Sequence, residues 1–215
     1  MGATDRLHIE LQRMAIGYEW RPGERINELE LSRQLKVSRS PLREALNRLV
    51  AEGFLVSKPN QGFFCRPFDP DELFNLYDFR CVVETQIVKL VAERAPERIL
   101  YDLVEMAKKE VIKDKVLMLQ EDEAFHLALA QATGNNEFVK ALTSINNKIH
   151  FARWIDLRSQ EYSKNEHVVI AQAIENRNGS LAESLMRAHI QKRYTQIVEI
   201  TRLGFGEIYL RTKAT

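Results

Sequence analysis

Cysteine is scarce in this sequence, with two residues of that type among 215 and no CxxC pair. Cys65 and Cys81 are too few for a disulfide framework, so we expect two buried or half-buried thiols. No window approaches the roughly 18 uncharged apolar residues that a membrane span requires. The N-terminus carries Asp5, Arg6 and Glu10 where a signal peptide would be apolar. We therefore expect a cytoplasmic protein with no membrane partner.

Net charge is also small, because 31 Lys and Arg residues face 30 Asp and Glu residues. This balance conceals an uneven distribution: residues 1–68 hold 11 basic and 8 acidic residues, and the remainder holds 20 and 22. The basic excess is concentrated between positions 33 and 48, where a single acidic residue, Glu44, stands among Arg33, Lys36, Arg39, Arg43 and Arg48. Such a local bias is typical of a surface that contacts phosphates.

The first 66 residues show the order helix, helix, turn, helix, hairpin. Apolar spacing predicts helices over about 5–16 and 28–35 and a third from Ser38 to Gly53. Two short β-like runs, 54–57 and 63–66, flank a turn that contains Pro59 and Gly62. There is no internal repeat or low-complexity tract. This order predicts a winged helix-turn-helix.

The third helix has one apolar and one polar face. Ser38 is a suitable N-cap, since its hydroxyl can accept a bond from an amide of the first turn, where Pro41 also falls. The buried stripe is expected to consist of Leu42, Ala45, Leu46, Leu49 and Val50. The opposite face then presents Arg39, Ser40, Arg43 and Asn47.

Two prolines in the segment 67–70 mark a boundary, because proline opposes both helix and strand there. Beyond it the pattern is helical throughout, and the short loops indicate an antiparallel bundle. We expect helices over about 71–94, 96–109, 113–132, 136–157, 160–176 and 180–203. The fold class is thus mainly α, with a winged helix-turn-helix over 5–66, a linker over 67–70, an all-α effector domain over 71–203 and a C-terminal tail over 204–215.

A long ordered string of residues resembles the DNA-binding domain of the GntR family of bacterial transcription regulators. The matching positions are Ile16, Gly17, Pro22, Gly23, Leu31, Leu35, the run from Val37 to Leu46, Glu52, Gly53 and Gly62. The resemblance covers residues 5–66. It implies a homodimer whose two recognition helices read a short inverted repeat in double-stranded DNA.

The chemistry of the third helix agrees with this resemblance. Arginine offers a fork of donors that can pair with guanine O6 and N7, and Arg39 and Arg43 lie one turn apart. Ser38 and Ser40 can help to hold a phosphate at the helix N-terminus. Asn47 shares this face. The alternative is an amphipathic helix whose arginines are merely solvated.

Two further positions bear on the DNA contact. Gly62 at the hairpin tip would let the backbone approach the minor groove, although a tight turn explains a glycine there equally well. Leu29 stands where the fatty-acid-responsive member of the family has a DNA-contacting arginine, so no base contact from the second helix is assigned.

Four residues of the second half form a candidate metal site: Asp122, His126, His167 and His189. Asp122 and His126 are four residues apart, so both project from one face of one helix. The other two histidines lie among apolar residues on later helices. Each histidine alone is more often a core or surface residue, which is how we interpret His8 and His150. The set of four resembles the metal-binding subset of FCD effector domains over residues 71–203.

The resemblance also implies a ligand. One carboxylate and three imidazoles suit zinc, nickel, cobalt, iron or manganese, and we expect zinc or nickel. A small organic acid would complete the coordination of the metal. Arg80 matches the family's arginine near the start of the effector domain and is the candidate carboxylate clamp, with an ion pair to Glu84 as the alternative. Arg153 is a second candidate, on its helix position alone.

We therefore expect a transcription regulator, and specifically a repressor, that responds to a small carboxylate bound at the metal. A metal-sensing regulator is the alternative. A metal-dependent enzyme, with Glu123 or Glu84 as base, is a third class. The sequence offers no nucleophile or oxyanion motif for it, and an enzyme does not explain residues 5–66.

Overall fold

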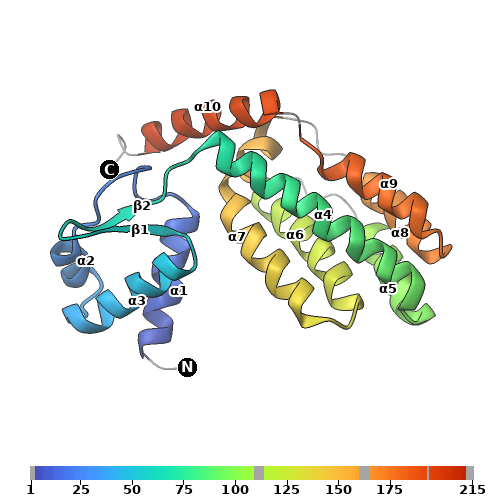
Figure 1. The fold of residues 1–215 in the computed structure, drawn as a ribbon, viewed down its shortest axis with the longest axis horizontal. Coiled ribbons are helices and arrows are strands. Elements are labelled where there is room, and N and C mark those ends of the chain that lie inside the picture. Colours follow the sequence, from blue (N-terminus) through green and yellow to red (C-terminus); the bar gives the residue numbers. More distant parts are fainter. Residues whose placement is uncertain (1–2, 109–113, 160–164, 193, 212–215) are drawn as a thin grey trace. The chain divides into compact units, whose positions relative to one another are not determined.

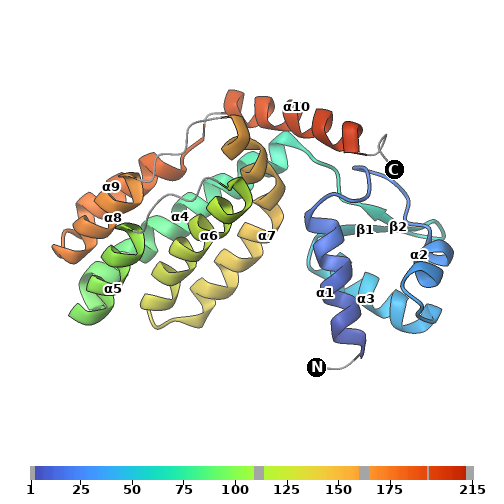
Figure 2. The same ribbon diagram turned by 180° about the vertical axis from the view of Figure 1, so that it is seen from behind.

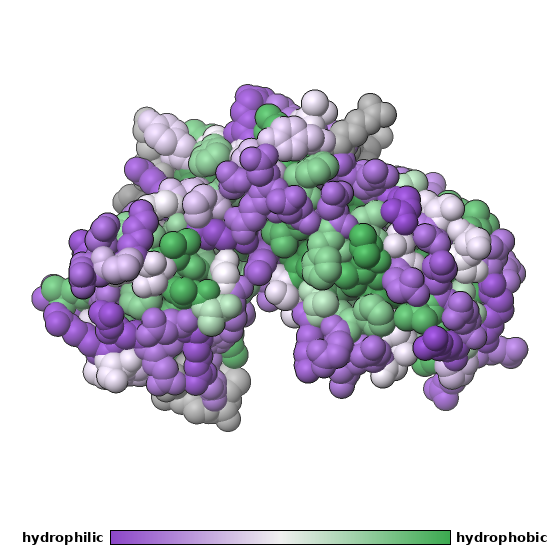
Figure 3. Space-filling view, in the orientation of Figure 1, coloured by the Kyte–Doolittle hydropathy of each residue, from purple (hydrophilic) through white to green (hydrophobic). Residues whose placement is uncertain are grey.

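The computed structural model describes residues 3–108, 114–159, 165–192 and 194–211. The chain divides into two compact units: Met1–Asp69 with Thr201–Thr215, and Pro70–Ile200. No helix in the described ranges is long and apolar enough to cross a membrane. The face drawn in Figure 3 is largely polar, with apolar residues exposed over α4 (Pro70–Arg94), where Phe79 and Val82 are solvent-exposed.

The first unit is a winged helix-turn-helix, as predicted (Figure 1). Its elements are α1 (Ala3–Ile16), α2 (Glu28–Gln34), α3 (Arg39–Ala51), β1 (Leu55–Lys58) and β2 (Gly62–Cys65). The two strands form an antiparallel hairpin in which Leu55 pairs with Cys65 and Lys58 with Gly62. An isolated bridge between Arg25 and Phe64 ties the segment before α2 to this wing.

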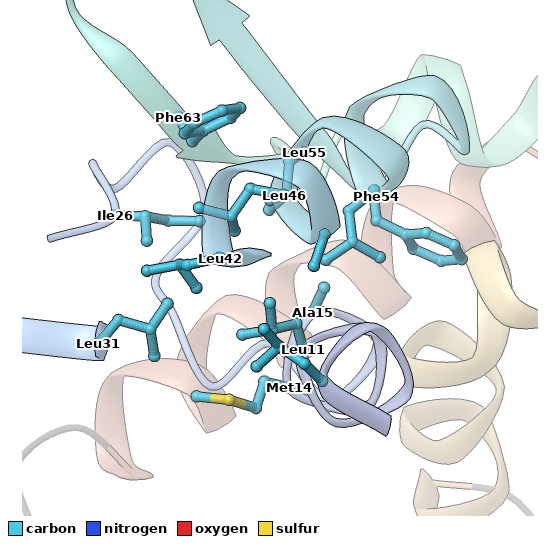
Figure 4. Close-up of a cluster of buried hydrophobic side chains, with 13 residues drawn as sticks. Leu11, Met14, Ala15, Ile26, Leu31, Leu42, Leu46, Phe54, Leu55 and Phe63 are labelled. Atoms are coloured by element: carbon cyan, nitrogen blue, oxygen red, sulfur yellow. The ribbon is translucent and has the colours of Figure 1, made fainter. Parts of the chain in front are cut away.

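The core of this unit lies between α1, α3 and the wing (Figure 4). Leu42, Ala45, Leu46 and Leu49, spaced at three and four residues along α3, are all fully buried. The predicted stripe is therefore the buried face of the helix, although Val50 at its edge is only partly buried. Burial of this one face leaves the opposite face of α3 in solvent.

The predicted capping bond of Ser38 is wrong. Ser38 has the extended backbone of an N-cap residue (φ −75°, ψ 164°), but its side chain makes no capping hydrogen bond. A capping hydroxyl accepts from the second or third amide of the helix, and Pro41 occupies the third position without an N–H. The Ser38 side chain is exposed and remains available to a ligand.

The second unit is a helical bundle built around α4 (Figures 1 and 2). Buried residues cover most of the circumference of α4, which packs against α6, α7, α8 and α9, whereas one stripe that includes Phe79 and Val82 is exposed. The remaining helices are α5 (Glu97–Lys108), α6 (Lys115–Ala132), α7 (Asn136–Ser159), α8 (Asn165–Glu175) and α9 (Gly179–Ile190). Short loops join α6 to α7 and α8 to α9, and each pair packs together. The ends predicted at 109, 113 and 160 lie outside the described residues.

The single helix predicted over 180–203 is instead two helices. Gln191 leaves the helical conformation (φ −61°, ψ 118°), and α10 runs from Tyr194 to Arg211 through part of the predicted tail. No glycine or proline marks this break. It is held by side-chain contacts, since Lys192 pairs with Asp156 at 2.7 Å and the Tyr194 hydroxyl donates to Asp71 at 2.6 Å.

The end of α10 belongs to the first unit. Phe68 is almost fully buried there, with its ring 5.2 Å from that of Tyr18 and 6.0 Å from that of Phe205. A Cβ at Gly204 would lie 2.3 Å from the Phe68 ring, so only glycine permits this close packing.

Candidate functional site

The four residues predicted as metal ligands converge on one point. One donor atom from each lies within 4.8 Å of the others, although Asp122 and His126 come from α6, His167 from α8 and His189 from α9. The Nε2 atom of His189 is 3.2 Å from those of both His126 and His167. Asp122 Oδ1 is 3.3 Å from His167 Nε2. Ligand bonds of about 2.0–2.2 Å put neighbouring donor atoms about 3 Å apart, so these separations fit one small cation.

Burial keeps the three imidazoles neutral. His126 and His167 are buried, and desolvation followed by neighbouring positive groups lowers the pKa of His167 far below its usual range. Burial likewise lowers the pKa of His126 and brings that of His189 to about 4. A neutral imidazole carries the lone pair that a metal requires. The cluster therefore offers three nitrogen donors and one carboxylate at neutral pH.

Two carboxylates outside the predicted set orient these rings. His126 donates through Nδ1 to Glu84, and His189 donates through Nδ1 to Glu166 at 2.6 Å. A carboxylate at Nδ1 directs the Nε2 lone pair of the same ring toward the metal position. The sequence does not indicate Glu166, and it indicates Glu84 only as a base or as a partner of Arg80, because both contacts join different helices.

Arg80 forms an ion pair with Glu84, which was the alternative to its predicted role as a carboxylate clamp. Its Nε donates to Glu84 Oε1 at 2.5 Å, and both side chains are buried. Although burial alone would raise the pKa of Glu84, the adjacent Arg80 and His126 hold it well below its usual range. Arg80, Glu84 and His126 thus form a continuous chain of hydrogen bonds to the cluster. The Nη2 atom of Arg80 is buried and has no hydrogen-bond partner in the described chain.

Like Arg80 Nη2, the Tyr77 hydroxyl and the Asn146 Nδ2 are buried without a hydrogen-bond partner among the described residues. Burial, with the Asp156 charge, raises the pKa of Tyr77 to about 12, so its hydroxyl keeps its proton. Arg80 and Arg153 lie close enough to perturb that pKa, and Arg153 donates to Asn146 Oδ1 at 3.4 Å. Neither Tyr77 nor Asn146 is predicted from the sequence, although Tyr77 lies one turn before Arg80.

Arg153 is held against the cluster of candidate metal ligands. It is buried and pairs with the Asp122 carboxylate, and its Nη1 is 3.5 Å from Glu123. Glu123 also accepts from His150 Nδ1 at 3.0 Å, which keeps His150 outside the cluster. Of the two predicted effector residues, Arg153 contacts the candidate metal ligand Asp122 directly, whereas Arg80 is linked to the candidate ligand His126 through Glu84.

The residues predicted to contact DNA lie on the open face of the first unit. Ser38, Arg39, Ser40, Arg43 and Asn47 are exposed on or next to α3. Gly62 begins β2 with φ +92°, a conformation that favours glycine. A groove of about 490 Å³ crosses this face and is lined by Arg25, Ile26, Asn27, Glu28, Leu29, Arg39 and Arg43. Arg25 and Glu28 are not predicted from the sequence, because neither belongs to the periodic pattern of α3.

Comparisons with known proteins agree with both halves of this description. The family described as "Bacterial regulatory proteins, gntR family" matches residues 4–65, and the FCD domain matches residues 75–192. The chain is 43% identical over 201 residues to the Nta operon transcriptional regulator of Aminobacter aminovorans, covering 92% of this chain and 96% of the relative. It is 31% identical over 201 residues to the transcriptional regulator LutR of Bacillus subtilis, covering 80% and 90%.

A solved structure supports the fold. The crystal structure of a GntR transcriptional regulator from Rhodococcus sp. RHA1 matches with a TM-score of 0.72 at 23% identity, covering 91% of this chain and 97% of that one. These relatives are transcriptional regulators and not enzymes, which sets the metalloenzyme alternative aside. The chain therefore belongs to the GntR family of bacterial regulatory proteins, and it is a DNA-binding transcription regulator that carries an FCD domain.

Proposed function

We propose that Asp122, His126, His167 and His189 bind one divalent transition metal. Three neutral imidazoles and one carboxylate, with donor separations near 3.2 Å, favour zinc or nickel over harder cations. The carboxylates at the Nδ1 atoms of His126 and His189 support this assignment, because they keep both rings in the ligating orientation.

A small organic acid is the effector that this site would receive. The observation that carries this step is that three buried polar atoms have no hydrogen-bond partner among the described residues: Tyr77 Oη, Arg80 Nη2 and Asn146 Nδ2. Each is a hydrogen-bond donor, and leaving a buried donor unpaired costs roughly 1–3 kcal/mol. A carboxylate supplies acceptor oxygens for several donors at once, and its charge would be stabilised by the metal and by Arg80 and Arg153.

The output is DNA binding. Arg39 and Arg43 would read guanines in the major groove, and Asn47 lies on the same face of α3. Ser38 and Ser40 would contact phosphate, and the wing at Gly62 would approach the minor groove. A homodimer would place two such faces on an inverted repeat, and the exposed Phe79 and Val82 on α4 offer an apolar surface for pairing. We propose that the protein is a repressor whose operator affinity changes with effector binding. A coupling of about 1–3 kcal/mol would change that affinity about 5- to 150-fold.

One experiment tests the metal and the effector together. The metal content of purified wild-type protein is measured by mass spectrometry, and a panel of mono-, di- and tricarboxylates is then screened by thermal shift with metal and with chelator. We expect stoichiometric metal and a stabilising acid that acts only on the metal-loaded protein. His126→Ala should abolish both, whereas the matched variant His150→Ala should keep both, because His150 lies outside the cluster.

Two outcomes would contradict the proposal. Full metal content in His126→Ala would remove the assigned site. If the metal alone changed operator affinity and no acid in the panel had an effect, the protein would be a metal sensor instead of a carboxylate-responsive regulator.

A further inference from the structure

A carboxylate holds Arg43 on the proposed DNA-binding face. Glu28, the first residue of α2, accepts from Arg43 Nη1 with its two oxygens at 3.1 and 3.3 Å. The guanidinium carbon also lies 5.5 Å from the centre of the Phe63 ring in β2. The Arg43 side chain is still 56% exposed, whereas that of Glu28 is 23% exposed. The guanidinium is thus held by two neighbours and open to solvent.

The contact leaves one edge of Arg43 uncommitted. Within the described ranges, Nη1 is the Arg43 nitrogen with a hydrogen-bond partner, and Nη2 and Nε have none. These two adjacent N–H groups form a fork that matches guanine O6 and N7. Because Nη1 is bound to Glu28, the edge left for a base is the one formed by Nη2 and Nε.

We propose that Glu28 is a specificity-determining positioning residue, which fixes the edge of Arg43 that reads guanine and prevents Arg43 from binding phosphate indiscriminately. The inference rests on the proposed DNA-binding face and deepens it. A mobile arginine can pair with any phosphate along a duplex, and such contacts carry no sequence information. A carboxylate beside it both immobilises the guanidinium and repels the phosphate backbone, so non-specific affinity falls.

The position of Glu28 is itself constrained by the wing. A Cβ at Gly62 would lie 3.4 Å from Glu28 Oε1 and 3.9 Å from Arg25 Nε, so the wing packs closely beside both side chains. Arg25 and Arg39 line the same groove as Glu28. Glu28 is therefore the acidic member of a groove that otherwise presents three arginines.

The test compares wild-type protein with Glu28→Gln, which removes the charge and keeps the size. The probes are the duplex that wild-type protein selects from a randomised pool and a scrambled duplex of equal length. We expect Glu28→Gln to bind the scrambled duplex more tightly and to lower the ratio of specific to non-specific affinity about fivefold or more, the discrimination of one good bidentate contact. The slope of log affinity against log salt should steepen by about 0.9, one additional phosphate contact.

Glu30→Gln is the matched control, because it makes the same charge change two residues away and Glu30 contacts Asn27 instead of an arginine. It should leave the specificity ratio within about twofold of wild type. In an Arg43→Ala background, Glu28→Gln should have no further effect on discrimination, because the side chain that it positions is gone. Thermal unfolding of each variant checks that the fold is retained.

The outcomes separate this inference from the function it rests on. Failure of wild-type protein to select any sequence would overturn the proposed DNA reading itself. If Arg43→Ala lost the selected guanine while Glu28→Gln kept full discrimination, the DNA-binding face would stand and the role of Glu28 would be wrong. A loss of preference at a base pair that Arg43→Ala does not affect would mean that Glu28 contacts a base itself, and would also overturn positioning.

Discussion

Removing a single hydroxyl should stabilise this protein and at the same time weaken effector binding. Tyr77→Phe deletes a buried oxygen that has no partner among the described residues and leaves the ring, which is 3% exposed, in place. An unpaired buried hydroxyl costs roughly 1–3 kcal/mol. For a chain of about 150–250 residues, each kcal/mol raises the melting temperature by about 2–4 °C. The variant should therefore melt at least about 2 °C above wild type without effector.

The effect on binding has the opposite sign. Because the pKa of Tyr77 is raised to about 12, its hydroxyl remains a donor at neutral pH. A hydrogen bond to a charged acceptor contributes about 1.5–3 kcal/mol, so affinity for the carboxylate found in the thermal-shift screen should fall about tenfold or more. Calorimetric unfolding and isothermal titration of metal-loaded protein measure the two quantities separately.

An exposed tyrosine provides the control. Tyr101 on α5 is 58% exposed, and Tyr101→Phe should change neither quantity appreciably, since surface substitutions usually stay within about 0.5 kcal/mol. A lower melting temperature for Tyr77→Phe with unchanged carboxylate affinity would refute the reasoning, because the hydroxyl would then serve packing and not ligand recognition.

Two further predictions concern α10 and the imidazoles. Gly204→Ala should destabilise the first unit by about 1–3 kcal/mol, because the added Cβ would lie 2.3 Å from the Phe68 ring. Gly206→Ala should instead stabilise α10 by about 0.5–1 kcal/mol, because nothing lies within 4 Å of its added Cβ. Urea unfolding of both variants measures the two free-energy changes. In chelating buffer the pKa of His189 is near its usual 6.5 in the unfolded chain, and burial lowers it to about 4 in the folded chain. Its stabilising contribution is therefore complete above pH 6.5 and is lost as pH falls toward 4. Urea titrations across that window should show a smaller pH dependence for His189→Gln than for wild type, and equal slopes would contradict the buried neutral imidazole.

The winged helix-turn-helix could be predicted because its signals are local. The apolar spacing along α3, from Leu42 to Leu49, fixes which face is buried, and the turn before Gly62 fixes the hairpin. The break at Gln191 could not be predicted, since no helix-breaking residue marks it and the contacts of Lys192 and Tyr194 that hold it are long-range. The close approach of Gly204 to Phe68 was unpredictable for the same reason.

The same contrast between local signals and long-range contacts applies to the candidate site. The spacing of Asp122 and His126 on one helix is a local pattern that predicts half of the candidate ligand set from the residues alone. His167 and His189 are predicted through the resemblance to FCD domains. Glu166 contacts a histidine on another helix, and no local pattern distinguishes Glu166, Tyr77 or Asn146 from ordinary helical residues. They are identified as candidates only by that contact and by the buried atoms that lack a partner among the described residues.

The charges around the cluster predict that binding of the proposed metal and of the proposed effector is coupled. Among the buried groups, Arg80 and Arg153 are balanced by Glu84 and Asp122, and the three imidazoles are neutral. A divalent cation adds two positive charges beside two arginines, and an anionic effector offsets that excess. Metal and carboxylate should therefore bind with positive cooperativity, and linkage requires each to raise the affinity of the other by the same factor. Zinc titrations with and without saturating carboxylate, and the converse titrations, should give equal factors above one; a factor of one would mean that the acid binds independently of the metal.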